Sequence, residues 1–461
     1  MKLNRFIGDS AFYRKALSIA IPVLIQNTIT SFVSLLDNIM VGQVGTLQMS
    51  GVSIVNSLLL VFNLCIFGAN AGGGIFTAQF HGCGDHTSIR RSHRVKLYVG
   101  TALSVAAILL FLFAGDSLIG LYLRGEGAPE DAALALQYGR NYLAVMLFGL
   151  LPFALTTSYA GTLRETGHTT VPMVGGIAAV LVNLVLNYTL IFGHFGAPAL
   201  GVEGAAIATV ISRYVELAIV AGWAHLNPKK NPFVQGLFRS FYVPKALLGN
   251  IFRKGMPLVL NEFLWSTGLA MIHQSYSTCG LDVVPALNIA NTIFNLANVS
   301  SIAFGNAVAI MMGQLLGSGA QEKVVRDTNR KLMALTVFCG FLVGTVLLLC
   351  SDAFPMLYNT TDDVRHLAGQ MIRIIAIMLP VSCFTLATYF TLRSGGQALI
   401  TFLFDSCYQW VCPVLLSVLL TRFTDISILP LYTICQAVDG IRCFIGGYML
   451  KQGKWIKNLT V

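Results

Sequence analysis

Two acidic residues, Asp37 and Glu262, lie inside long apolar stretches of the sequence. A charge at the centre of a bilayer costs about 3 kcal/mol or more, so acids in such stretches usually serve a function. Asp37 ends a polar face that also holds Gln26, Thr30 and Ser34, all within about 80° of helical arc. A carboxylate beside neutral oxygen atoms can take up a proton or weakly hold a monovalent cation such as Na⁺. The alternative is that Asp37 lies near the outer interface, where water hydrates it.

The stretch "PLVLNEFLWS" (257–266) places Glu262 five residues after a proline that can loosen the helix and free a backbone carbonyl. His273 follows on nearly the same helical face, and Trp265 lies almost one turn from Glu262. Glu262 could serve a function, which is the default for an intramembrane acid, or form a structural ion pair. His273 and Trp265 could line a substrate path, although packing is the simpler role for Trp265.

Asparagine recurs in three apolar segments at spacings that keep it on one helical face. The three sets are Asn56, Asn63 and Asn70; Asn288, Asn291, Asn295 and Asn298; and Asn183 with Asn187. Such side chains can hydrogen-bond between helices, or they can line a hydrated cavity that binds substrate. Both roles fit these spacings, and one stripe can serve both.

The composition restricts the class of protein that can hold these residues. The chain has 461 residues, of which 55% are hydrophobic and only 11% charged. A soluble domain carries about 25% charged residues, so this sequence indicates a polytopic membrane protein. The net charge of +10 comes from basic residues beside apolar spans, which favours an orientation signal over nucleic-acid binding. Ten scattered cysteines without a CxxC pair indicate core residues, and no enzyme motif or phosphate loop is present.

Apolar stretches long enough to cross a bilayer recur twelve times. Their approximate limits are 16–41, 49–80, 95–115, 134–160, 170–193, 203–225, 247–277, 284–316, 331–351, 368–392, 398–421 and 428–450. If the N-terminus is inside, the loops rich in lysine and arginine all fall on the cytoplasmic side. We therefore expect a multi-pass protein of the cytoplasmic membrane with both termini in the cytoplasm.

The two halves of the chain repeat one another at a shift of 235 residues. The coinciding pairs include Pro22 and Pro257, Gly45 and Gly280, Asn56 and Asn291, Gln79 and Gln314, and Gly82 and Gly317. Six spans per half would give two lobes related by a pseudo-two-fold axis along the membrane normal, with a cavity between them. We expect an N-terminal lobe at 1–226, a cytoplasmic linker at 227–246 and a C-terminal lobe at 247–461. This all-α plan is typical of a transporter.

Several stretches together resemble the multidrug and toxic compound extrusion (MATE) family over essentially the whole chain. They are "LLDNIMVGQVG", "TAQFHGCGD", "LRETGHT", "LNYTLIFGHFGAPALGVEGAAIAT", "PLVLNEFLWS", "GQLLGSG" and the closing "GKW". The resemblance implies export of small amphipathic, often cationic, compounds against an inward flow of sodium ions or protons. No other cofactor and no nucleic acid is expected, and we expect a monomer. The alternative is a lipid-linked precursor flippase of the same superfamily, which would usually have a more basic central cavity.

The resemblance also implies roles for single residues. Asp37 matches a first-helix aspartate implicated in coupling, Asn183 matches the asparagine beside it, and Glu262 matches a glutamate of the sodium-coupled branch. Two departures concern the ion sites. Asn187 stands where some members have a second acid, and "PVSCFTLATYFTLR" (380–393) lacks the tenth-helix aspartate of the sodium-coupled branch. A possible Na⁺ site at Asp37 is therefore better supported than one at Glu262.

Overall fold

The computed structural model describes residues 6–123, 129–280, 282–358, 360–424 and 426–460, and within these ranges it contains helices and no strands. Eleven helical segments in the described ranges are long and apolar enough to cross a membrane. The twelfth expected position is taken by another long helix, α8 (Lys245–Ser277), in which charged residues interrupt the apolar run. The chain is thus an all-α, multi-pass membrane protein, as the sequence predicts.

Two compact units divide the chain. The first, here called the N unit, comprises Ile25–Thr77 and Asp85–Gly255; the second, the C unit, comprises Met1–Leu24, Ala78–Gly84 and Met256–Val461. The helices α1 (Ser10–Gly42), α2 (Thr46–Cys83) and α8 contribute residues to both units. The lobe boundaries expected near 226 and 247 remain predictions.

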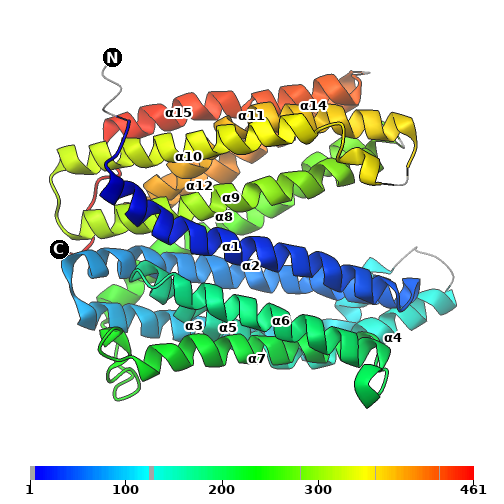
Figure 1. Cartoon of the computed structure of the whole chain (residues 1–461), viewed down its shortest axis with the longest axis horizontal. Coiled ribbons are helices and arrows are strands. Elements are labelled where there is room, and N and C mark those ends of the chain that lie inside the picture. Colours follow the sequence, from blue (N-terminus) through cyan, green and yellow to red (C-terminus); the bar gives the residue numbers. More distant parts are fainter. Residues whose placement is uncertain (1–5, 124–128, 281, 359, 425, 461) are drawn as a thin grey trace. The chain divides into compact units, whose positions relative to one another are not determined.

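The N unit also contains α3 (His86–Tyr122), α4 (Pro129–Met146), α5 (Leu150–Glu165), α6 (Thr170–Phe192) and α7 (Val202–Leu226). Asp85 caps the start of α3, where its side chain accepts a hydrogen bond from the Ser88 N–H. Helix α6 ends at Gly193 in the left-handed conformation that commonly terminates helices. Helix α7 packs against α4, α5 and α6 (Figure 1), and these contacts bring polar positions of α6 and α7 together.

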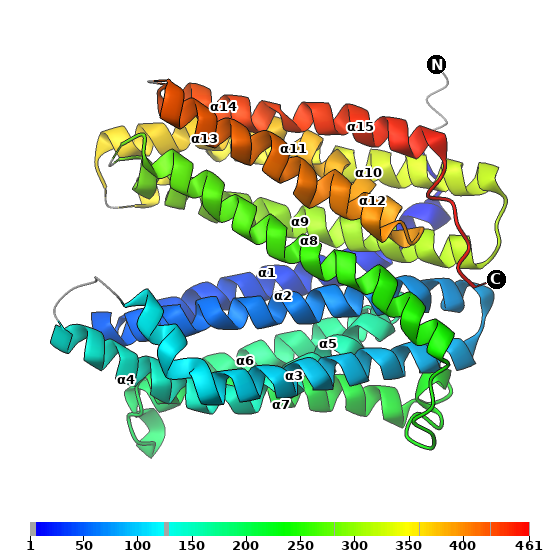
Figure 2. The same cartoon turned by 180° about the vertical axis from the view of Figure 1, so that it is seen from behind.

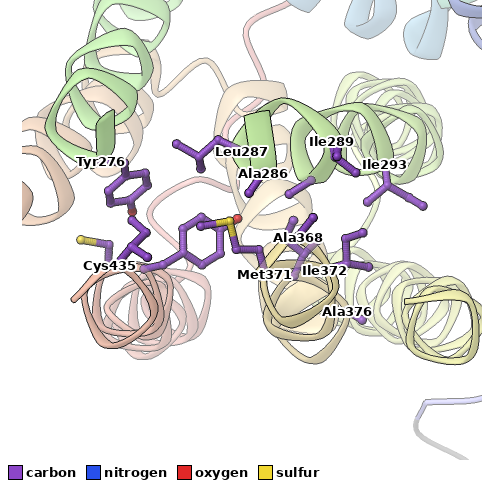
Figure 3. Packing of buried hydrophobic residues seen from close by; sticks show 14 of the residues in the cluster. Tyr276, Ala286, Leu287, Ile289, Ile293, Ala368, Met371, Ile372, Ala376 and Cys435 are labelled. Atoms are coloured by element: carbon purple, nitrogen blue, oxygen red, sulfur yellow. The ribbon is translucent and has the colours of Figure 1, made fainter. Parts of the chain in front are cut away.

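The C unit also contains α9 (Val283–Gly317), α10 (Glu322–Cys350), α11 (Asp362–Ser394), α12 (Ala398–Phe402), α13 (Leu415–Phe423), α14 (Ile428–Ala437) and α15 (Asp439–Gln452). Helix α11 packs against α9, α10, α14 and α15. Figure 3 shows how aliphatic side chains of α9, such as Leu287 and Ile293, face Met371 and Ile372 of α11. Tyr276 of α8 and Cys435 of α14 join the same core.

Two of the expected spans are interrupted in the C unit. Between α12 and α13 the chain forms two π-helical turns, η6 (Leu403–Cys407) and η7 (Trp410–Val414), although Figure 2 shows the segment as one continuous rod. Pro413 lies in the second turn and lacks the N–H that an α-helix needs. Helices α14 and α15 are separated at Val438. Such π-turns often lie at functional sites because they redirect side chains.

The end of α2 and the end of α9 approach one another closely in the C unit. A Cβ atom added to Gly82 would lie 2.0 Å from the Gln314 carbonyl oxygen, and one added to Gly317 would lie 1.9 Å from the Gln79 carbonyl oxygen. These four residues are two of the pairs that the sequence repeat relates to one another. The repeat therefore appears in the structure as a reciprocal contact that requires glycine on both helices.

Candidate functional site

Asp37 of α1 lies against the polar face of α6. The Asn187 amide donates a hydrogen bond to Asp37 Oδ1 over 2.6 Å and approaches Asn183 Oδ1 at 3.1 Å. Both asparagines are buried, because their four-residue spacing places them on the same inward face of α6. The structure thus brings together three of the four residues expected to couple ions.

The second amide in this cluster, that of Asn183, can exist in two arrangements. Its side-chain atom facing Asp37 lies 2.9 Å from Oδ1 and 3.1 Å from Oδ2. With nitrogen at that position, Asn183 donates to the ionised carboxylate. With oxygen there, a hydrogen bond requires a proton on Asp37, since two acceptors cannot bond to one another. The geometry therefore fits both charge states of the acid.

Further oxygen atoms surround this cluster. Asn187 Oδ1 is buried and has no hydrogen-bond partner among the described side chains. Thr209 Oγ1 of α7 lies 3.4 Å from the Asn183 amide. In the same unit, Tyr142 of α4 donates to Asn56 Oδ1 over 3.3 Å. A carboxylate among amide, hydroxyl and phenol groups can accommodate a small cation or a proton.

The remaining predicted residues of this region lie elsewhere. Gln26 is buried and accepts a hydrogen bond from Arg164 Nη2 of α5 over 2.7 Å, about three helical turns from Asp37 along α1. Thr30 is exposed, and the Ser34 side chain lies outside the described residues. Asn63 Oδ1 is buried without a partner in the described part of the chain, whereas Asn56 is exposed. The polar face of α1 thus serves two separate clusters.

Glu262 of α8 lies in a second polar cluster, which belongs to the C unit. Tyr389 of α11 donates to Glu262 Oε1 over 3.3 Å. The charges of Arg393 and Asp405 also act on this carboxyl group. Glu262 is therefore neither isolated nor bound in a simple ion pair.

Asp405, in the π-helical turn η6, connects this cluster to α15. Its carboxylate pairs with the Arg442 guanidinium and accepts from the Asn261 amide over 2.8 Å. Arg442 also lies 3.9 Å from Asp439 and stacks over the Phe404 ring. Asp405 thus brings a second acid near Glu262 from a helix other than the tenth span, where the sequence has none.

The other predicted residues of the C unit form no single site with Glu262. His273 Nε2 lies 3.5 Å from the Asn291 amide, so the predicted polar positions of α8 and α9 meet at this pair. Asn288 and Asn295 are exposed, and the Trp265 side chain is partly buried. His273 is about three turns from Glu262 along the same helix. These residues therefore remain candidate cavity positions without a shared hydrogen-bond network.

Several charged residues of the clusters were not among the predicted site residues. Arg164 lies near Glu216 of α7 in the N unit, and Asp405 and Arg442 pair in the C unit. Their position inside apolar segments is the sequence signal that could have identified them. Arg373 of α11 pairs with the exposed Asp352 and belongs to neither cluster. In the described ranges, no group of three or more His, Cys, Asp or Glu residues could hold a metal ion.

Comparison with known proteins adds a family model, MatE, which matches residues 22–189 and 257–419. A probable multidrug resistance protein, NorM of Thermotoga maritima, is 23% identical over 453 residues, covering 97% of this chain and 94% of that protein. The multidrug resistance protein MdtK of Yersinia pestis is 26% identical over 367 residues, covering 79% and 78% of the two chains. The two ranges that the family model matches correspond to the two halves that repeat one another in the sequence.

Solved structures of low sequence identity share the fold. A multidrug resistance MATE family transporter in an outward-facing conformation superposes with a TM-score of 0.86 at 19% identity, covering 98% of both chains. The Vibrio cholerae MATE transporter VcmN gives a TM-score of 0.85 at 18% identity, covering 97% of this chain and 99% of that one. These matches establish a two-lobed helical transporter fold.

Proposed function

Because the chain belongs to the MatE family of multidrug and toxic compound extrusion proteins, we propose that it exports amphipathic, often cationic, compounds by antiport with sodium ions or protons. The chain is a multi-pass membrane transporter and not an enzyme. Relatives named for multidrug resistance support drug-like substrates over a lipid-linked precursor. We further propose a monomer in the cytoplasmic membrane with both termini inside.

The arrangement of Asp37, Asn183 and Asn187 carries the coupling proposal. When Asp37 is ionised, both amides can donate to it; when it is protonated, it can donate to the Asn183 oxygen. A bound Na⁺ would likewise be met by carboxylate and amide oxygens. Either ion removes the negative charge, so the two states of Asp37 favour different hydration of the helices around it.

Ion binding can drive transport only if the ion prefers one conformation of the protein over another. A neutralised Asp37 is compatible with a dry interior, whereas an ionised Asp37 favours access to water. Release of the ion into the cell would leave Asp37 ionised and favour the conformation in which water reaches it. Export of the substrate would return the protein to the conformation that binds the next ion. Glu262, beside Tyr389 and Asp405, provides a second position where the same argument applies.

Accumulation of a fluorescent lipophilic cation in bacteria without their own efflux pumps tests this function. We expect cells that express the wild-type chain to accumulate several-fold less dye than cells without it. Asp37→Asn should abolish this difference. The control Asp116→Asn removes an exposed acid at the end of α3 and should export like the wild type.

Two outcomes would contradict the proposal. One is equal dye accumulation with and without the wild-type protein at confirmed membrane expression. The other is export that persists unchanged after ionophores collapse both the sodium and the proton gradients, because the chain would then use another energy source.

A further inference from the structure

A basic cavity lies at one end of the N unit, between the start of α3 and the loop that follows α7. Its volume is about 710 Å³.

 The lining of this cavity includes four arginines and three hydroxyl side chains, namely Arg90, Arg91, Arg94, Arg239, Thr87, Ser240 and Tyr242. Figure 2 shows the loop at the end of the N unit where α3 begins.

Two of the arginines and a tyrosine attach the loop to α3. Arg94 donates to the main-chain oxygens of Leu237, Gly236 and Tyr242, at 2.8, 2.8 and 3.3 Å. Arg90 donates to the Pro232 oxygen, and Tyr98 donates to the Phe241 oxygen. These bonds hold the loop in place, but neutral carbonyl groups do not balance the charge of the guanidinium groups.

The positive charge of the remaining guanidinium groups has little anionic compensation among the described residues. Arg91 and Arg239 form no ion pair with the described residues, and Arg90 Nε is buried there without a hydrogen-bond partner. The carboxylate of Asp85, next to the cavity in the sequence, interacts electrostatically with Arg91. Burial raises the pKa of Asp85, but hydrogen bonds from Ser88 and Thr87 together with the charge of Arg91 hold the pKa below its usual value. The described lining of the cavity thus holds four guanidinium groups and no carboxylate.

We propose that this cavity binds a phosphate group, either in the headgroup of an anionic phospholipid or as a free phosphate. Guanidinium groups match phosphate oxygens in pairs, and charge-assisted bonds of this kind are stronger than neutral ones. The loop is expected on the cytoplasmic side, where anionic headgroups attract basic segments of membrane proteins. A phosphate between Arg91 on α3 and Arg239 on the loop would link the two segments. This proposal does not depend on which compound is exported.

Binding to the purified full-length chain in detergent tests the proposal. The probes are short-chain phosphatidylglycerol, short-chain phosphatidylcholine and inorganic phosphate, and the readouts are melting temperature and native mass spectrometry. We expect an anionic probe to raise the melting temperature, with phosphatidylcholine having no such effect. The double variant Arg91→Gln/Arg239→Gln should weaken anion binding about ten-fold or more, since it removes two charge-assisted contacts.

The double variant Lys229→Gln/Lys230→Gln is the matched control, because it removes the same charge from exposed positions near the cavity. It should bind the anion like the wild type. A response to phosphatidylglycerol alone would identify a lipid headgroup, and a response to inorganic phosphate would identify a free anion. Equal loss in both double variants, or no anion-dependent response in the wild type, would overturn the proposal.

Discussion

Asp37 shows how neutral side chains can keep an acid in an apolar helix. The amides of Asn183 and Asn187 come from one face of α6, and the Asn187 donor lies 2.6 Å from the carboxylate. Amide groups can reorient to serve as donors or acceptors, whereas a fixed arginine would hold the acid permanently ionised. The cluster can therefore change its charge without losing its hydrogen bonds.

Glu262→Gln should leave folding and substrate binding intact but remove the ion-dependent part of the conformational change. Glutamine has the shape of the neutral acid and cannot ionise, so it permanently mimics one of the two states. The measurement is the change in a fluorescence label upon addition of Na⁺ or acid, in wild type and variant. Glu322→Gln, which removes an exposed acid, is the control. An identical ion response in all three proteins would assign Glu262 a structural role.

Arg442→Gln should destabilise the protein by about 3 kcal/mol, because it leaves the largely buried Asp405, whose side chain is 13% exposed, without its charged partner. The double variant Asp405→Asn/Arg442→Gln should recover part of this loss, since Asp439 is then the one acid of the group left without Arg442. Thermal or denaturant unfolding in detergent measures both effects. A double variant as unstable as the sum of the single variants would show that the two residues act independently.

The sequence identifies the acids more readily than their partners. Asp37 and Glu262 stand out because they are charged residues in apolar runs. The pairing of Asp405 with Arg442 depends on how η6 packs against α15. The spacing of residues along one helix does not tell which residues of another helix they contact. For the same reason, Gln26 could be placed on the face of Asp37 but not beside Arg164.

At the scale of the helices, the close approach of α2 and α9 depends on glycine. Gly317→Ala should cost about 1–3 kcal/mol, because the new methyl group would overlap the Gln79 carbonyl unless the helices separate. Gly447→Ala is the control, since nothing lies within 4 Å of its added Cβ in α15. Melting temperatures of the two variants test this prediction. Equal stability would mean that the helices can separate without cost.

Helix positions follow from apolar length, whereas the breaks within helices do not. The spans expected at 398–421 and 428–450 are found, but η6, η7 and the separation at Val438 divide them. A proline such as Pro413 marks a possible interruption without specifying its form. Pro22 and Pro257, by contrast, lie inside the long helices α1 and α8.

For the whole molecule, the distribution of basic residues predicts the orientation in the membrane. Single cysteines at His194 and Met356 should react with an impermeant label from outside, and those at Lys230 and Lys323 only from inside. All four positions are exposed, so burial does not limit the reaction. The experiment needs a background in which the native cysteines are replaced. Reversed access at either pair would contradict the assigned topology around it.

Transport by the purified chain in lipid vesicles tests the central claim most directly. Sodium and proton gradients are imposed separately, and movement of a fluorescent cation is followed in wild type and in Asp37→Asn. Antiport predicts that at least one gradient drives the wild type several-fold faster than no gradient, and that Asp37→Asn binds the cation but does not respond. Equal transport with and without both gradients, or an undiminished response in Asp37→Asn, would contradict coupling through Asp37.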